Sequence, residues 1–213
     1  MNENIAGIRQ DYQQQSLLEK NVKTDPISQF STWWDDALKS EITEVNAMTL
    51  ATASAAGAPS ARIVLLKSFS EEGFVFFTNY NSKKGNDLEE NPNACLVFFW
   101  KELERQVRIS GKVSKIAAGE SDEYFNSRPG GSKIGAWASP QSSVIASRET
   151  IESNTTKFEQ QFTGGNIERP PHWGGYILEP NVIEFWQGRP NRLHDRILYS
   201  LQKGNWIIER LAP

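Results

Sequence analysis

The stretch "AMTLATASAAGAPSARIVLLKSFSEEGFVFFTN" (residues 47–79) contains three apolar segments rich in β-branched and aromatic residues. Polar turns separate these segments: one surrounds Gly57 and Pro59, and the other contains Glu72 and Gly73. Short apolar segments joined by such turns are typical of antiparallel strands that follow one another along the chain. The stretch therefore predicts strands over 47–54, 61–69 and 74–79.

The same reading extends over the rest of the chain. It predicts further strands over 94–100, 105–116, 174–180, 182–188, 195–202 and 205–212, and helices over 26–40, 82–91, 118–127 and 147–162. The first helix has a clear start, because Asp25 suits the N-cap and Pro26 suits the first turn. Many short antiparallel strands without a repeated strand–helix–strand order favour a mainly β protein with peripheral helices (α+β), built as a barrel.

The 213 residues are enough for one domain with a sizeable core and short for two. Residues 1–24 are polar and rich in glutamine, which predicts a mobile N-terminal arm that carries Arg9 and Tyr12. Residues 25–213 are then expected to form a single domain.

The composition and sequence motifs indicate which partners the protein lacks and where in the cell it is expected. The net charge of −3 offers no overall positive field for nucleic acid. Nothing resembles a leader, and no apolar run approaches the length of a membrane span, so we expect a cytoplasmic protein that contacts no membrane. The only cysteine, Cys95, is expected to be a buried core thiol. Motifs for a metal site, a P-loop or a Rossmann dinucleotide site are absent, so we expect no metal.

The segment "RPNRLHDR" (189–196) places Arg192, His194 and Arg196 at every second position. If the segment is extended, all three side chains project from one face of a strand. Clustered cationic groups repel each other unless an anion lies among them, and a phosphate or carboxylate is the simplest anion. Ordinary solvated arginines on an edge strand are the alternative.

The predicted helix at 82–91 carries two cations at its start. Ser82 suits the N-cap, which puts Lys83 and Lys84 in the first turn, where positive charge opposes the helix dipole. A bound phosphate would make this arrangement favourable, so we interpret it as a phosphate site.

A second anion site is suggested at the end of the helix over 118–127. Tyr124 and Arg128 are four residues apart, Pro129 ends the helix, and Ser132 follows in what we read as a flexible Gly-Gly turn. A phenol, a guanidinium and a hydroxyl could then meet at one phosphate, although a solvated helix end explains the pattern equally well.

Other candidates are weaker from spacing alone. Arg62 and Lys67 are five residues apart, so they lie on opposite faces of a regular strand, and one site uses both only through a bulge or by different routes. Gln106, Gln141 and Ser142 could bond a heterocycle, and Trp186 could cover a flat ring or lie in the core.

Together these residues resemble the pyridoxamine 5'-phosphate oxidase family over nearly the whole chain. The motifs that carry the resemblance are "RIVLLK" (62–67), "TNYNSKKG" (78–85), "LERQVRISG" (103–111), "YFNSRP" (124–129), "IGAW" (134–137), "QSS" (141–143), "IEFWQG" (183–188), "RLHDR" (192–196) and the terminal "RLAP". The resemblance implies an FMN-binding split β-barrel and a homodimer with FMN at the interface. It also implies FMN-dependent oxidation of pyridoxamine or pyridoxine 5'-phosphate to pyridoxal 5'-phosphate, with O₂ as acceptor and H₂O₂ as product.

The resemblance also assigns roles to residues. It implies an FMN site made of Arg62, Ile63, Val64, Leu65, Leu66, Lys67, Phe77, Thr78, Lys83, Lys84, Gln106, Gln141, Ser142, Trp186 and Arg196. The substrate phosphate would meet Lys67, Tyr124, Arg128 and Ser132, while Arg192 and His194 would lie at the reacting carbon as catalytic residues, and Arg9 and Tyr12 would close over the site.

The sequence departs from the family pattern at two places. Gly130 and Gly131 occupy a loop where relatives often carry charged residues, and Phe77 stands where tyrosine is common, which predicts altered affinity rather than lost activity. Two other functions remain open at this point: a non-catalytic protein that binds FMN or pyridoxal phosphate, and a flavin reductase that uses NADH or NADPH.

Overall fold

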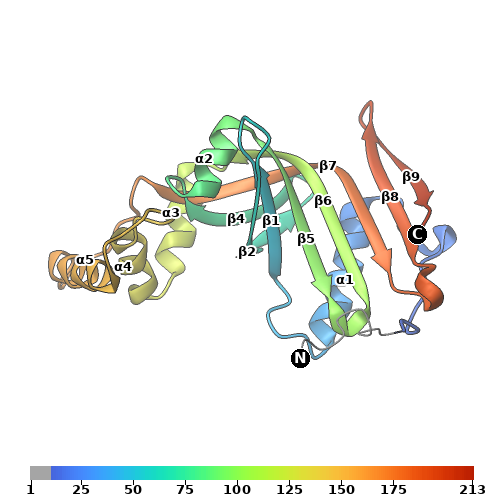
Figure 1. Ribbon diagram of the computed structural model, residues 1–213, viewed down its shortest axis with the longest axis horizontal. Coiled ribbons are helices and arrows are strands. Elements are labelled where there is room, and N and C mark those ends of the chain that lie inside the picture. The colour runs from blue at the N-terminus through green and yellow to red at the C-terminus, as the bar shows by residue number, and fades with distance from the viewer. Residues whose placement is uncertain (1–10) are drawn as a thin grey trace, which may run out of the picture. The chain divides into compact units, whose positions relative to one another are not determined.

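The computed structural model describes residues 11–213 (Figure 1). Over these residues the strands are β1 (Ala47–Ala53), β2 (Pro59–Leu65), β3 (Ser68–Ser70), β4 (Gly73–Asn79), β5 (Asn93–Trp100), β6 (Arg105–Lys115), β7 (Trp173–Gln187), β8 (Asp195–Gln202) and β9 (Asn205–Leu211). The helices are α1 (Pro26–Lys39), α2 (Lys83–Glu90), α3 (Ala118–Ser127), α4 (Gly130–Ala138) and α5 (Arg148–Gln161), with short 3₁₀ turns at Glu19–Asn21, Lys101–Leu103 and Pro190–Arg192. The mainly β class with helices is therefore confirmed.

The strands join in the order β2-β1-β5-β6-β7-β4-β3, with β8 paired to β7 and β9 paired to β8. Two compact units divide the chain. The first contains the segment that ends at Thr49, Cys95–Ser110 and Pro180–Pro213, and the second contains Leu50–Ala94 and Gly111–Glu179. The expectation of one domain after residue 24 stays a prediction. Within residues 11–213, no helix is long and apolar enough to cross a membrane.

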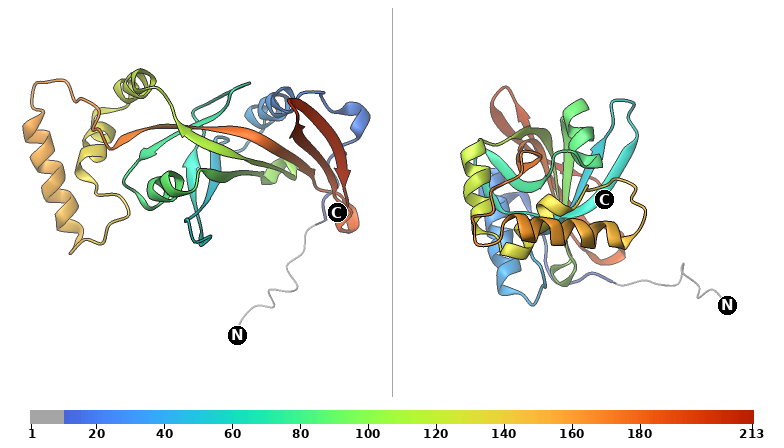
Figure 2. Two further views of the ribbon diagram at one scale, coloured as in Figure 1. Left: turned by 90° about the horizontal axis from the view of Figure 1, so that it is seen from above. Right: turned by 90° about the vertical axis from the view of Figure 1, so that its left-hand side faces the viewer.

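Aromatic packing forms the core of the first unit. Asp25 caps α1 by accepting a hydrogen bond from the Ser28 backbone N–H at 2.6 Å. The buried face of α1 then places Phe30 5.3 Å from Phe98 and Trp33 5.2 Å from Phe185, measured between ring centroids. The second half of β7 pairs with β8, and β8 turns directly into β9, so the last strands form one antiparallel ribbon, seen in red in Figure 2.

The second unit contains the strands and helices that carry the candidate phosphate ligands. Phe77 on β4 pairs with Gly175 on the first half of β7. Helix α2 begins directly after β4, and Gly85 in its first turn is required by packing, because a Cβ there would lie 1.9 Å from the Tyr80 carbonyl oxygen. Helices α4 and α5 lie side by side (Figure 1).

Three predicted elements differ from those observed. The strand predicted over 61–69 is broken into β2 and β3, because the chain leaves β1 after Leu65 and joins β4, where the Lys67 N–H bonds to the Val75 carbonyl at 2.9 Å. The strands predicted over 174–180 and 182–188 form one strand, β7. Pro180 takes part in neither of two pairings of this strand, because the pairing with β4 ends at Leu178 and the pairing with β8 starts at Val182.

Two loops were also misread. The Gly-Gly turn is the first turn of helix α4, for which Pro129 is the N-cap residue, so Ser132 is helical. The segment 189–194 is not extended: Pro190 starts a 3₁₀ turn, and Asn191 and Arg192 have φ angles of 57° and 62°. Arg192, His194 and Arg196 therefore do not share one strand face. Cys95 is half-buried on β5 rather than fully buried.

Candidate functional site

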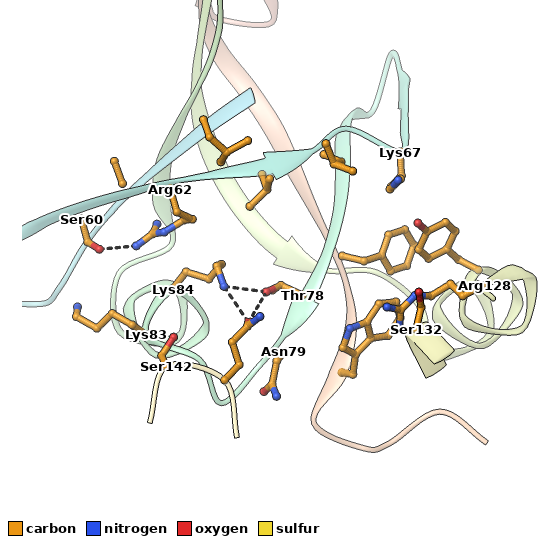
Figure 3. Close-up of a pocket in the computed structure, with 18 of the residues that line it drawn as sticks. Ser60, Arg62, Lys67, Thr78, Asn79, Lys83, Lys84, Arg128, Ser132 and Ser142 are labelled. Carbon is orange, nitrogen blue, oxygen red and sulfur yellow. Dashed lines mark hydrogen bonds between the residues drawn. The ribbon is translucent and has the colours of Figure 1, made fainter. Parts of the chain in front are cut away.

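A cavity of about 840 Å³ lies in the second unit (Figure 3). Its cations form two groups, with Arg62, Lys83 and Lys84 on one side and Lys67 and Arg128 on the other. The lining residues are Ser60, Ala61, Arg62, Ile63, Val64, Leu65, Lys67, Phe77, Thr78, Asn79, Lys83, Lys84, Tyr124, Arg128, Pro129, Ser132, Gln141, Ser142 and Trp173.

Lys84 is the most unusual cation of the cavity, because only 8% of its surface is exposed. Its Nζ donates to three neutral oxygens: Thr78 Oγ1 at 3.1 Å, Ser82 Oγ at 3.2 Å and Gln141 Oε1 at 3.0 Å. Burial, and secondarily the charge of Arg62, lower the pKa of Lys84 to about 8. A buried ammonium held only by neutral acceptors is stabilised by an anion that binds beside it.

Arg62 is held in a similar way by neutral groups. Its guanidinium donates to the Leu50 carbonyl at 3.1 Å, to Thr52 Oγ1 at 2.8 Å and to Ser60 Oγ at 2.5 Å. Burial lowers the pKa of Arg62, and the nearby carboxylate of Asp87 partly offsets this effect.

Asp87 connects two of the cations on this side of the cavity. Its buried carboxylate accepts a hydrogen bond from Thr52 Oγ1 at 2.8 Å and forms an ion pair with Lys83. Asp87 thus interacts with Lys83 and Arg62, while Lys84 donates only to neutral oxygens, which leaves an excess of positive charge for a dianion such as a phosphate.

The other side of the cavity combines a guanidinium with stacked rings. The Phe77 and Tyr124 rings stack with their centroids 3.9 Å apart, and the Arg128 guanidinium lies 4.5 Å from the centre of the Trp173 ring. Arg128 Nη1 is buried and, within residues 11–213, has no hydrogen-bond partner. Burial lowers the pKa of Arg128. A buried, unsatisfied guanidinium N–H that faces a cavity is suited to binding an oxyanion.

In the first unit, His194 has a defined tautomer. The Arg189 backbone N–H donates to His194 Nδ1 at 3.1 Å, so the ring proton of the neutral imidazole lies on Nε2. Burial, and then the charge of Arg192, lower the pKa of His194, which favours the neutral imidazole. The ring of Trp186 lies 4.6 Å from that of His194, centroid to centroid.

Arg196 is oriented by a buried acid. Its Nε donates to Glu184 Oε1 at 2.8 Å, and its Nη1 donates to the Ala212 carbonyl at 2.8 Å. Glu184 also pairs with Arg108 at 3.2 Å and is only 5% exposed. The hydrogen bond to Glu184 and the charge of its carboxylate raise the pKa of Arg196.

Two family profiles together span most of the chain. The profile described as "Pyridoxamine 5'-phosphate oxidase" matches residues 34–162, and the one described as "Pyridoxine 5'-phosphate oxidase C-terminal dimerisation region" matches residues 173–213. The chain belongs to the pyridoxamine 5'-phosphate oxidase family. The resemblance found in the sequence motifs is therefore confirmed.

Curated relatives agree with this assignment to the family. The chain is 57% identical over 209 residues to the pyridoxine/pyridoxamine 5'-phosphate oxidase of Cyanothece sp., a match that covers 98% of each chain. It is 53% identical over 210 residues to the enzyme of the same name from Bordetella pertussis, covering 98% of this chain and 99% of the relative.

Solved structures support the same fold. PhzG from Burkholderia lata superposes with a TM-score of 0.87 at 30% identity, covering 92% of this chain and 98% of that one. A pyridoxamine 5'-phosphate oxidase-related, FMN-binding protein from Nostoc punctiforme superposes with a TM-score of 0.69 at 17% identity, covering 90% and 100%. The second likeness concerns the fold alone. The expected split-barrel fold of the family is confirmed.

Most residues that the family resemblance implied for FMN or the substrate phosphate line the 840 Å³ cavity of the second unit. These are Arg62, Ile63, Val64, Leu65, Lys67, Phe77, Thr78, Lys83, Lys84, Tyr124, Arg128, Ser132, Gln141 and Ser142. Leu66 is buried and does not line this cavity. Arg62 and Lys67 line opposite sides of the same cavity, because β2 ends at Leu65 and the opposite-face rule for a regular strand does not apply to Lys67.

The remaining candidates belong to the first unit: Tyr12, Gln106, Trp186, Arg192, His194 and Arg196. Arg9 lies outside the described residues. Sequence reasoning missed Ser60, Ala61, Asn79, Pro129 and Trp173 as lining residues. Ser60 could have been found, because it is two residues from Arg62 on the same strand, whereas no local pattern distinguishes Trp173 from a core tryptophan.

Proposed function

We propose that the protein oxidises pyridoxamine 5'-phosphate or pyridoxine 5'-phosphate to pyridoxal 5'-phosphate, with FMN as its cofactor. The substrate loses two electrons and two protons, O₂ takes them up to give H₂O₂, and water releases ammonia when the substrate is the amine. The observation that carries the proposal is the pair of cationic groups in one cavity, because this reaction brings together two phosphorylated molecules.

FMN fits the group formed by Arg62, Lys83 and Lys84. The phosphate of FMN would supply the negative charge that is missing around the buried Lys84, because the three hydrogen-bond acceptors of the Lys84 ammonium are neutral oxygens. When bound, FMN supplies the hydride acceptor and the subsequent reaction with O₂. The protein's own groups bind the phosphate, orient the ring system and exclude water.

The substrate phosphate is assigned to Lys67, Tyr124, Arg128 and Ser132. Arg128 supplies a buried N–H without a partner, and Ser132 lies in the first turn of α4, whose backbone N–H groups favour an anion. Lys67 Nζ, 5.8 Å from the Tyr124 ring centre, adds a second positive charge.

Arg192 and His194 are proposed as the catalytic residues at the reacting carbon. His194 presents Nε2–H as a donor, because its Nδ1 is already an acceptor of the Arg189 N–H. Such a donor can orient the amine nitrogen or the alcohol oxygen of the substrate without removing a proton. Arg192 has a left-handed backbone, which is uncommon for a residue with a Cβ and is often found at functional sites.

Further assignments complete the proposal. Gln106, Gln141, Ser142, Trp186 and Arg196 would contact FMN, together with Ile63, Val64, Leu65, Leu66, Phe77 and Thr78. The match of residues 173–213 to a dimerisation region supports a homodimer. The position of FMN at its interface is what the family resemblance implies. A cytoplasmic location rests on the sequence alone.

The test is anaerobic mixing of the FMN-loaded protein with pyridoxamine 5'-phosphate, followed by admission of air. We expect the visible flavin absorption to bleach, and then to recover as stoichiometric pyridoxal 5'-phosphate forms. A flavin that stays oxidised would contradict the proposal. Bleaching by NADH or NADPH instead would favour a flavin reductase, and binding without any reduction would favour a non-catalytic binding protein.

A further inference from the structure

Residues 12–19 lie along the first unit and are held there through their backbone. The Gln14 N–H donates to Glu104 Oε2 at 3.1 Å, and the Leu17 N–H donates to Asp195 Oδ2 at 3.0 Å. The Leu17 side chain is only 5% exposed, so the segment is anchored by an apolar contact as well.

Arg210 on β9 is the centre of these contacts. Its guanidinium donates to both carboxylate oxygens of Glu19, to Asp195 Oδ1 at 2.8 Å and to the Leu17 carbonyl at 2.9 Å. A single exposed ion pair contributes little to stability, but a bidentate pair inside a network of charged hydrogen bonds contributes more. Arg210 thus joins the N-terminal segment to the last two strands.

Asp195 connects this network to the candidate catalytic residues. It follows His194 directly in the sequence and accepts hydrogen bonds from both Leu17 and Arg210. It also lies 3.5 Å from Arg189, whose backbone N–H holds His194. One carboxylate therefore fixes the N-terminal segment and the turn that carries His194.

The same segment places Tyr12 against the candidate site. The Tyr12 ring meets Trp186 edge-on at 5.7 Å and lies 6.0 Å from the His194 ring, measured between centroids. Gly188 makes room for this ring, because a Cβ at that position would lie 2.6 Å from Tyr12 Cγ.

We propose that Glu19, Asp195 and Arg210 form a clamp that holds residues 12–19 in the ligand-free protein, so that Tyr12 is a permanent wall beside His194. Arg210 is then a positioning residue that acts through Tyr12. The clamp itself is independent of the proposed function, whereas its effect on turnover rests on that function.

The first test is amide hydrogen exchange on the full-length, ligand-free protein. We expect the Leu17 amide to be protected, and to exchange about tenfold faster in Arg210→Gln and Glu19→Gln as the clamp opens locally. Arg148→Gln is the matched control, since it removes an exposed ion pair with Glu152 on α5, and it should leave Leu17 unchanged. A Leu17 amide that is unprotected in the unmodified protein, or equally protected in Arg210→Gln, would overturn the clamp.

The second test separates the clamp from the position of Tyr12. Gly188→Ala should displace the Tyr12 ring while Leu17 stays protected, and Arg210→Gln should release both. Both variants are expected to raise KM for pyridoxamine 5'-phosphate by about tenfold with little change in kcat. The reason is that Tyr12 would contact the bound substrate and the transition state equally.

A double-variant cycle decides whether Arg210 acts through Tyr12. In a Tyr12→Ala background, Arg210→Gln should cause no further rise in KM, because the wall is already absent. Additive effects would overturn the positioning role. If the protein does not turn over pyridoxamine 5'-phosphate at all, the proposed function fails while hydrogen exchange still decides on the clamp.

Discussion

The proposed role of Lys84 as a ligand of the FMN phosphate predicts that FMN binding depends on pH. Its pKa of about 8 in the free protein lies below the ordinary lysine value, whereas a bound phosphate would raise the pKa again. Below pH 8 the ammonium is charged before and after binding, but above pH 8 a proton must be taken up. We expect the affinity for FMN, measured by quenching of flavin fluorescence, to fall as pH rises from 7 to 9.5, a range in which the FMN phosphate stays a dianion.

The control for this prediction replaces lysines of different burial. Lys84→Met should bind FMN more weakly and with a flatter pH dependence, while Lys112→Met on the exposed face of β6 should behave like the unmodified protein. An unchanged pH dependence in Lys84→Met would show that another group titrates.

If Arg128 binds the substrate phosphate as proposed, replacing it should separate substrate binding from cofactor binding. A charged hydrogen bond to phosphate contributes about 1.5–3 kcal/mol, so Arg128→Ala should raise KM for pyridoxamine 5'-phosphate by about 10-fold or more. The FMN dissociation constant should change little, because the Arg62 side of the cavity is untouched. Arg128→Lys should recover part of the loss through its charge. Equal weakening of both ligands in titrations would contradict the division of the cavity.

At the level of the element, the start of α2 is stabilised by Ser82 against two lysines that oppose the helix dipole. Ser82 Oγ accepts from the Gly85 N–H at 3.3 Å and from Lys84 Nζ at 3.2 Å, and it donates to the Asn79 carbonyl at 2.7 Å. Ser82→Ala should therefore cost about 1 kcal/mol and lower Tm by about 2–4 °C. Ligand-free samples in differential scanning calorimetry would measure this change.

Another helix of the same chain provides the control for Ser82. Ser147 occupies the N-cap position of α5, but its side chain makes no capping hydrogen bond. Ser147→Ala should consequently leave Tm nearly unchanged, and an equal loss in both variants would indicate that the cap of α2 is not special. The Ser82 variant should also bind FMN more weakly, since Lys84 loses one of its acceptors.

For the whole molecule, the match to a dimerisation region over 173–213 has a thermodynamic consequence. This region includes Trp173 on strand β7, which lines the cavity, so the region matched to dimerisation also contributes to the proposed ligand site. If the folded protein is a homodimer, Tm must rise with protein concentration by mass action. Tm must also rise with FMN, which stabilises the folded protein by about 2.7 kcal/mol when free FMN is at 100 times its Kd. Sedimentation velocity and thermal unfolding over a range of concentrations would test this, and a monomer that retains full FMN binding would contradict it.

Local patterns in the sequence were sufficient for most elements. The cap at Asp25 with the apolar stripe predicted α1 over 26–40, observed at Pro26–Lys39, and the alternating segment at 195–202 was observed as β8 without change. Lys83 and Lys84 were correctly placed in the first turn of α2, because a capping serine and helix geometry act over a few residues. The family motifs then identified most of the residues that line the cavity.

Other features depended on contacts between distant parts of the chain. The strand predicted over 61–69 breaks because the chain changes its pairing partner to β4, and this change brings Lys67 into the cavity. Ser132 lies in helix α4, whereas the sequence pattern after Pro129 predicted a turn. The clamp joins Glu19 to Arg210, 191 positions apart. Periodicity and capping are local properties of the amino-acid sequence, so the sequence determined the elements and the chemistry they carry. Strand pairing and the ion pairs between distant residues arise only when the chain is folded, and they decided which of these groups meet.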